Sequence, residues 1–197
     1  IITNLEEVSY GILLWRALLQ WLGGIGIIVM AIAILPMLSI GGMQLFKTES
    51  YETPDKIIPR AAIFASGISI VYIVLTSTWA FMLWLAGMPI FDSITHAMTT
   101  LATGGYSTKS ESLGAFNSVN IEMIIVVGMI VGSLPFIHYL SILKNGWKNL
   151  VNDQQVKWFL LILFFLISIV TFNLYINGQN FFSSLRVSIF NLSLIHI

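Results

Sequence analysis

Four long stretches without a single Asp, Glu, Lys or Arg constrain this chain more than any other feature. They cover residues 17–46, 61–91, 123–143 and 158–185. A helix needs about 20 mostly apolar residues to cross a bilayer, so each stretch has room for one crossing. We therefore expect an all-α integral membrane fold, with crossings at residues 13–38, 61–85, 121–143 and 158–176.

The composition excludes several other classes of protein. Hydrophobic residues make up 57% of the chain and charged residues only 9%, against roughly 25% in soluble domains. The basic and acidic residues balance at 9 each, so nothing in the charge points to a nucleic-acid partner. The chain has no cysteine, which excludes disulfides and thiolate metal sites. No nucleophile–base pair or phosphate loop is recognisable, and we expect no enzymatic activity.

The basic residues divide unevenly between the two sides of the membrane. Loops 39–60 and 144–157 share one side and hold Lys47, Lys56, Arg60, Lys144, Lys148 and Lys157. The other side holds Arg16, Lys109 and Arg186. The positive-inside rule places the first group in the cytoplasm, which predicts a multi-pass protein of the cytoplasmic membrane.

The connection at residues 86–120 is long for a simple loop. Residues 91–102 have apolar side chains at helical spacing, with Asp92 or Ser93 available as a cap, but the helix is too short to cross. A polar, glycine-rich turn follows at residues 103–108. Crossing, short helix, glycine-rich return and crossing form a re-entrant pattern, which predicts a short pore helix and a segment buried in protein or lining water at membrane depth.

The same pattern predicts an internal repeat. Residues 61–143 hold one complete copy, with its pore helix and return segment. Residues 1–60 are expected to be the closing crossing of a preceding repeat with its cytoplasmic loop. Residues 144–197 are expected to hold the next cytoplasmic loop, a first crossing and the start of another short helix, because residues 181–192 again form a short amphipathic segment.

The return segment has the composition of one wall of a potassium filter. A potassium ion in a membrane exchanges its water shell for oxygens, and backbone carbonyls of several converging strands supply them. Glycine allows backbone geometries that aim successive carbonyls at one axis. Candidate potassium-binding residues, through their backbone carbonyls, are Thr103, Gly104, Gly105 and Tyr106. The alternative interpretation is a plain glycine turn that ends the short helix.

Four strings of the sequence resemble one family closely. LWRALLQWLGGIGIIVMAIAILP at 14–36 and GGMQLFKTE at 41–49 resemble the second crossing and following loop of the first repeat in Trk-system potassium uptake proteins of the TrkH type. LAGMPIFD at 85–92 and ATGGYST at 102–108 resemble the pore helix and filter of the second repeat. The resemblance runs from about residue 10 to about 191, in order and spacing.

This resemblance implies a potassium-channel-like fold with four repeats around one pore, in the Trk/Ktr/HKT potassium transporter superfamily. It implies K⁺ as the transported ion, moving down its gradient or by symport, and no covalent cofactor. It also implies a homodimer in the bacterial inner membrane and a cytosolic nucleotide-binding regulatory subunit resembling TrkA. Only residues 103–106 carry over as filter residues, because the first, third and fourth filters are expected outside this chain. The alternative function is a non-conducting assembly subunit of a membrane complex.

Several single residues carry structural expectations. Pro135 is expected to kink the third crossing, with a gating hinge as the alternative. Gly128 and Gly132 form a GxxxG pair typical of close helix packing, and the glycines at 23, 24 and 26 suggest the same. His96 is expected to be packed or hydrogen-bonded within the short helix. Lys109 and Glu111 are expected to be a solvated pair, with the external mouth as the alternative.

Overall fold

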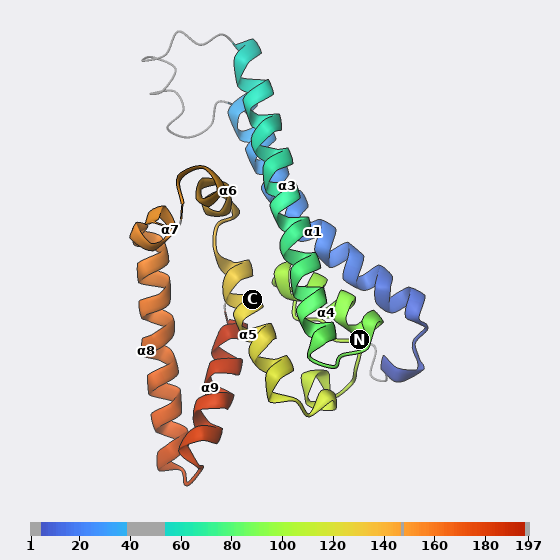
Figure 1. Ribbon diagram of the computed structural model, residues 1–197, viewed down its shortest axis with the longest axis vertical. Helices are drawn as coiled ribbons and strands as arrows, with labels where there is room; N and C mark the ends of the chain where they lie inside the picture. Colours follow the sequence, from blue (N-terminus) through green and yellow to red (C-terminus); the bar gives the residue numbers. More distant parts are fainter. Residues whose placement is uncertain (1–4, 39–53, 147, 196–197) are drawn as a thin grey trace.

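A computed structural model describes residues 5–38, 54–146 and 148–195, and within these residues all regular secondary structure is helical (Figure 1). The long helices are α1 (Tyr10–Leu38), α3 (Pro54–Leu85) and α8 (Gln154–Ile176). The shorter ones are η1 (Leu5–Glu7), α4 (Ile90–Leu101), η2 (Ser112–Phe116), α5 (Val119–Ser133), α6 (Phe136–Asn145), α7 (Lys148–Asn152) and α9 (Phe181–Ile195). Most of the expected cytoplasmic loop at 39–60, including the family-like string at 41–49, lies outside the described residues.

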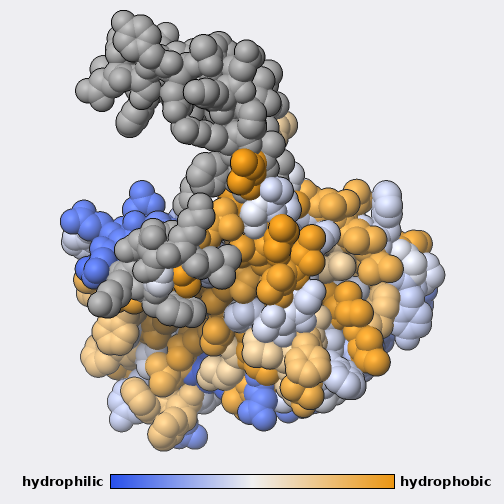
Figure 2. Space-filling model, turned by 45° about the horizontal axis from the view of Figure 1, so that its top comes forward, coloured by the Kyte–Doolittle hydropathy of each residue, from blue (hydrophilic) through white to orange (hydrophobic). Residues whose placement is uncertain are grey.

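Three helices confirm the expected crossings near residues 13–38, 61–85 and 158–176. The segments Tyr10–Ile27, Ala65–Leu85 and Gln154–Ile176 are long and apolar enough to cross a membrane. Large apolar side chains remain exposed along them, among them Phe164, Phe165 and Phe172 of α8. Orange apolar residues accordingly cover much of the visible described surface (Figure 2). Such an exposed apolar surface fits a lipid environment and not water.

The expected third crossing at 121–143 differs from the prediction, because it consists of two helices. α5 ends at Ser133, Leu134 is extended with ψ 144°, and α6 begins after Pro135. A residue before proline is driven toward extended dihedrals, which explains the break. The Tyr139 hydroxyl donates to the Val131 carbonyl at 2.6 Å, so one carbonyl at the open end of α5 is satisfied. Pro135 therefore separates two helices rather than kinking one.

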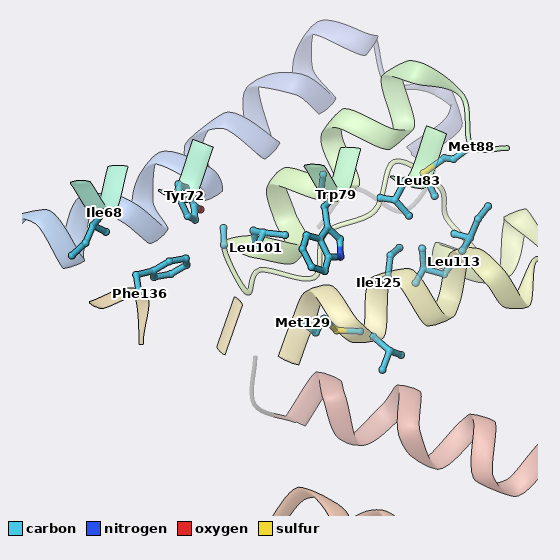
Figure 3. Packing of buried hydrophobic residues seen from close by; sticks show 14 residues of the cluster. Ile68, Tyr72, Trp79, Leu83, Met88, Leu101, Leu113, Ile125, Met129 and Phe136 are labelled. Carbon is cyan, nitrogen blue, oxygen red and sulfur yellow. The ribbon is translucent and has the colours of Figure 1, made fainter. Parts of the chain in front are cut away.

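α3 is the central helix of the fold. It packs against α1, α4, α5 and α6, while α8 and α9 form a separate hairpin whose α9 contacts α5 (Figure 1). The buried cluster lies where α3, α4 and α5 meet, and Figure 3 places Trp79 between Leu101 of α4 and Met129 of α5. The Trp79 indole N–H donates to the Ile124 carbonyl at 2.9 Å, which joins α3 to α5.

Glycines let α5 approach α3 and α4 closely, and let α1 approach the end of α4. A Cβ at Gly128 would lie 2.7 Å from Trp79 Cδ1, and one at Gly132 would lie 3.0 Å from the Leu101 carbonyl oxygen. A Cβ at Gly24 would lie 3.2 Å from Ala102 Cβ. The packing expected at these three glycines is confirmed. At residues 23 and 26, by contrast, a Cβ would meet no described atom within 4 Å.

α9 (Phe181–Ile195) covers the short helix expected at 181–192, and an ion pair joins it to α5. Arg186 Nε and Nη2 donate to the two carboxylate oxygens of Glu122 at 2.7 and 2.6 Å. This two-pronged geometry is the strongest form of arginine–carboxylate pairing. The pair links α9 to α5, across 64 positions of the sequence.

Candidate functional site

The short helix α4 buries a polar face. Pro89 precedes it, and the Ser93 hydroxyl lies within hydrogen-bond distance of the carbonyls of Met88 and Pro89. Ala97 and Leu101 of the expected apolar face are buried, but Ile94 is 40% exposed. The buried polar residues of α4 are Asp92, Ser93, Thr95, His96, Thr99 and Thr100. The expected apolar face is therefore only partly buried, and α4 contributes apolar side chains to the core while also burying polar ones.

A ladder of three hydrogen bonds holds the segment that follows the glycine pair against α4. Successive turns of the helix meet successive residues of the segment, which runs in the opposite direction. The pairs are Thr108 Oγ1 donating to Asp92 Oδ1 at 2.7 Å, His96 Nε2 with Ser107 Oγ at 3.0 Å, and Thr99 Oγ1 donating to the Tyr106 carbonyl at 2.8 Å. The ladder fixes the segment at a constant distance from the helix.

Two members of this ladder refine the expectations for single residues. His96 is buried and hydrogen-bonded, as expected. Its Nδ1 lies 2.8 Å from the Asp92 carbonyl, which can only accept, so Nδ1 carries a proton and a neutral ring accepts from Ser107 through Nε2. Asp92 does not cap the helix, because the cap position is Pro89 and the Asp92 carboxylate accepts from Thr108 instead.

The peptide groups at the start of the candidate filter have a defined orientation. The backbone N–H groups of Gly104 and Gly105 both donate to the Thr99 carbonyl, at 2.8 and 3.4 Å. In a trans peptide the N–H and C=O bonds point in opposite directions. The carbonyls of Thr103 and Gly104 are therefore directed away from the Thr99 carbonyl at the C-terminal end of α4.

Left-handed backbone at alternate positions produces this orientation. Thr103 has φ 53° and Gly105 has φ 65°, while Gly104 between them is not left-handed. A positive φ is unusual for a β-branched residue and costs on the order of 1–3 kcal/mol, so surrounding contacts must hold Thr103 in place. One such contact is the bond from the Thr103 N–H to the Thr100 carbonyl at 3.1 Å.

The four candidate residues are not equivalent. Thr103 and Gly104 are half-buried, whereas Gly105 and Tyr106 are exposed. The Tyr106 carbonyl points back to α4, where it accepts from Thr99. The Thr99 hydroxyl has a second acceptor, the His96 carbonyl at 3.2 Å, and its single proton serves one at a time.

α1 supplies two contacts to this segment that sequence reasoning missed. Arg16 Nη2 donates to the Ser107 carbonyl at 2.8 Å, and its guanidinium carbon lies 4.7 Å from the centre of the Tyr106 ring. A Cβ at Gly104 would lie 2.5 Å from Gln20 Cδ, so the Gln20 side chain covers that glycine. The sequence did contain a signal for these contacts. Arg16 and Gln20 are polar residues four positions apart near the start of an apolar helix, and this spacing places both on one face.

The residues after the ladder are less constrained. Lys109 is half-buried and Glu111 is exposed, and they form no mutual ion pair among the contacts between described residues. No group of three or more His, Asp or Glu residues in the described part of the chain is arranged to hold a metal ion. The candidate chemistry of this site therefore lies in backbone carbonyls.

Comparison with known proteins identifies relatives along almost the whole chain. The family model described as "TrkH: Cation transport protein" matches residues 1–187. The Trk system potassium uptake protein TrkI of Halomonas elongata is 41% identical over 194 residues, covering 97% of this chain and 39% of the relative. The Trk system potassium uptake protein TrkH of Escherichia coli K12 is 36% identical over 191 residues, covering 95% of this chain and 39% of the relative.

A solved structure gives the same result for the fold. The chain is similar to the crystal structure of the potassium transporter TrkH from Vibrio parahaemolyticus, with a TM-score of 0.83 and 33% identity over 99% of this chain and 40% of that one. The chain thus spans about two fifths of the length of these relatives. With a family model matched over most of its length and an agreeing helical arrangement, this chain belongs to the TrkH family of cation transport proteins.

Proposed function

We propose that this chain forms part of a membrane-spanning potassium uptake protein, in which residues 103–106 line one side of the ion path with backbone carbonyls. The supporting relatives are named as potassium uptake proteins and as a potassium transporter. The observation that carries the site is the pair of peptide groups whose N–H bonds converge on the Thr99 carbonyl. Their opposite ends, the carbonyls of Thr103 and Gly104, would supply two oxygens that can replace water around a cation.

The short helix adds an electrostatic contribution to the same site. α4 ends at Leu101, two residues before Thr103, and a helix C-terminus carries about half a negative charge. This partial charge favours a cation beside residues 103–106. Gly105 extends the proposed path outward; the Tyr106 carbonyl points to α4 and would have to turn away from Thr99 to line the path.

The remaining assignments follow from the proposed transport function. Residues 61–143 would form one complete repeat, with α4 as its pore helix re-entering the membrane between α3 and α5. Residues 1–60 and 144–197 would belong to the neighbouring repeats. We place the protein in the bacterial inner membrane, as a homodimer that works with a cytosolic nucleotide-binding regulatory subunit resembling TrkA. The carbonyl geometry supports transport rather than the alternative role of a non-conducting assembly subunit.

Replacing Gly105 by Ser tests the proposed filter. Gly105 has φ 65°, where a side chain is strained by about 1 kcal/mol or more, so the substitution is expected to turn the neighbouring carbonyls. The complete gene product is expressed in a bacterial strain deficient in potassium uptake, and rubidium uptake is measured in competition with potassium and sodium. We expect a clear loss of preference for potassium over sodium.

Gly114→Ser is the matched control. Gly114 lies in the same external connection, in η2, where a Cβ would meet nothing within 4 Å. It is expected to keep the wild-type preference. If Gly105→Ser also keeps it while the protein is present in the membrane, the filter assignment is wrong. A wild-type protein that reaches the membrane and moves no rubidium would instead favour the assembly role.

A further inference from the structure

Arg16 lies on α1, 91 positions before the residue that it contacts. Its Nη2 donates to the Ser107 carbonyl at 2.8 Å, and its guanidinium covers the Tyr106 ring at 4.7 Å. The side chain is half-buried. One arginine therefore binds two successive residues directly after the glycine pair.

The backbone that carries Arg16 is firmly placed. Leu13 and Ala17, on either side of it, are buried. One turn further on, the Trp21 indole donates to Thr76 Oγ1 at 3.0 Å, and the Tyr72 hydroxyl donates to the Trp21 carbonyl at 3.1 Å. These bonds fix α1 on α3, so the guanidinium acts from a rigid support.

Ser107 is bonded from two opposite elements. Its carbonyl accepts from Arg16 of α1, while its hydroxyl lies 3.0 Å from His96 Nε2 of α4. The same hydroxyl accepts from the Lys109 N–H at 3.1 Å. The bond from α4 reaches only the Ser107 hydroxyl. The bond to the Ser107 carbonyl comes from Arg16, so Arg16 adds a restraint that the ladder does not provide.

We infer that Arg16 is a positioning residue for the candidate filter, holding Tyr106 and Ser107 in place so that the Gly105 backbone keeps its left-handed geometry. The inference rests on the proposed function. Arginine suits the role because a planar guanidinium donates in its plane and stacks through its face at the same time, which lysine cannot do. The positive charge of Arg16 would also repel a cation that enters the path. A positioning role and a purely electrostatic role therefore make different predictions for Arg16→Lys, which keeps the charge.

Rubidium uptake by the complete gene product separates the two roles. Arg16→Lys keeps the positive charge but loses the planar guanidinium that donates to Ser107 and stacks on Tyr106. Arg16→Gln loses the guanidinium and the charge. We expect both variants to lower the preference for potassium over sodium by about tenfold, the factor that corresponds to one lost charge-assisted hydrogen bond. Lys109→Gln removes a nearby positive charge but keeps the backbone N–H that donates to the Ser107 hydroxyl, so it is expected to keep the wild-type preference.

Tyr106→Leu provides an independent arm. It removes the ring under the guanidinium and leaves the Ser107 carbonyl bond, so we expect a smaller loss of preference, and no added loss when it is combined with Arg16→Lys. A wild-type preference in Arg16→Lys overturns the inference. If neither Arg16 variant reaches the membrane, a wild-type preference in Tyr106→Leu overturns it.

Comparing the Arg16 variants with Gly105→Ser distinguishes the role of Arg16 from the filter assignment. If the wild-type protein transports rubidium and Gly105→Ser loses its preference while the Arg16 variants do not, only the role of Arg16 is wrong. If Gly105→Ser leaves the preference unchanged, the filter assignment fails first.

Discussion

Gly128→Ala tests the close contact between α5 and α3. A Cβ at Gly128 would lie 2.7 Å from Trp79 Cδ1 and 2.9 Å from Thr100 Cγ2. Carbon atoms in contact prefer about 3.5–4.0 Å, so neighbours on two sides must move by roughly an ångström. The indole is held by its bond to the Ile124 carbonyl and is only 7% exposed, which leaves it little freedom (Figure 3).

The expected cost combines three terms. Overpacking costs about 1–3 kcal/mol, and losing the indole bond adds about 1–3 kcal/mol. The better helix propensity of alanine returns about 1 kcal/mol. We expect a net destabilisation of about 3 kcal/mol. The complete gene product in detergent is heated and the monodisperse fraction is followed by size-exclusion chromatography, and its apparent Tm should fall.

Two further variants make the result specific. Gly11→Ala, within α1, places a Cβ where nothing lies within 4 Å, so it should keep or slightly raise the apparent Tm. Trp79→Phe removes the indole Nε1, the atom nearest to the new Cβ, so adding Gly128→Ala in that background should cost less than in the wild type. An unchanged or higher Tm in Gly128→Ala, or an equal loss in both backgrounds, would refute the steric argument.

Two other predictions concern the hydrogen-bond ladder and the ion pair. Thr108→Val removes the donor to the buried Asp92 carboxylate, so we expect a loss of about 1–3 kcal/mol in stability, measured by the same heating assay, and Thr108→Ser should restore it. Glu122→Gln breaks a surface-exposed pair and should lower the apparent Tm only slightly, with high salt reducing the wild-type value toward the variant. A large, salt-independent loss in Glu122→Gln would contradict the second of these.

The spacing of charged residues predicted the long helices because a helix that crosses a bilayer needs only a sufficiently long and apolar stretch. α1, α3 and α8 lie where charges are missing, and α4 lies within one residue of the expected 91–102. The break at Pro135 was harder to foresee. Proline is tolerated within membrane helices when neighbours satisfy the freed carbonyls, and only the structure reveals that Tyr139 does so for Val131.

The position of the site could be predicted from the sequence, but the side chains that hold it in place could not. The spacing of Gly104 and Gly105 after a short helix locates the segment, since glycine is where unusual dihedrals are cheapest. The partners of Ser107 come from His96, eleven residues away, and Arg16, ninety-one residues away. No local periodicity encodes such contacts, because they depend on how α1 and α4 pack. Asp92 was misjudged for the same reason: a carboxylate in a first turn usually binds that turn, and here it binds Thr108.

The order of residues along the chain also bears on how the segment is assembled during synthesis. Arg16, Gln20, Asp92 and His96 all precede Ser107, so these side chains of α1 and α4 have left the ribosome before the segment that they contact. Glu122 differs, because its partner Arg186 is synthesised 64 residues later. A nascent chain can therefore complete the surroundings of Gly105 early, while the junction between α5 and α9 closes only after α8 has entered the bilayer.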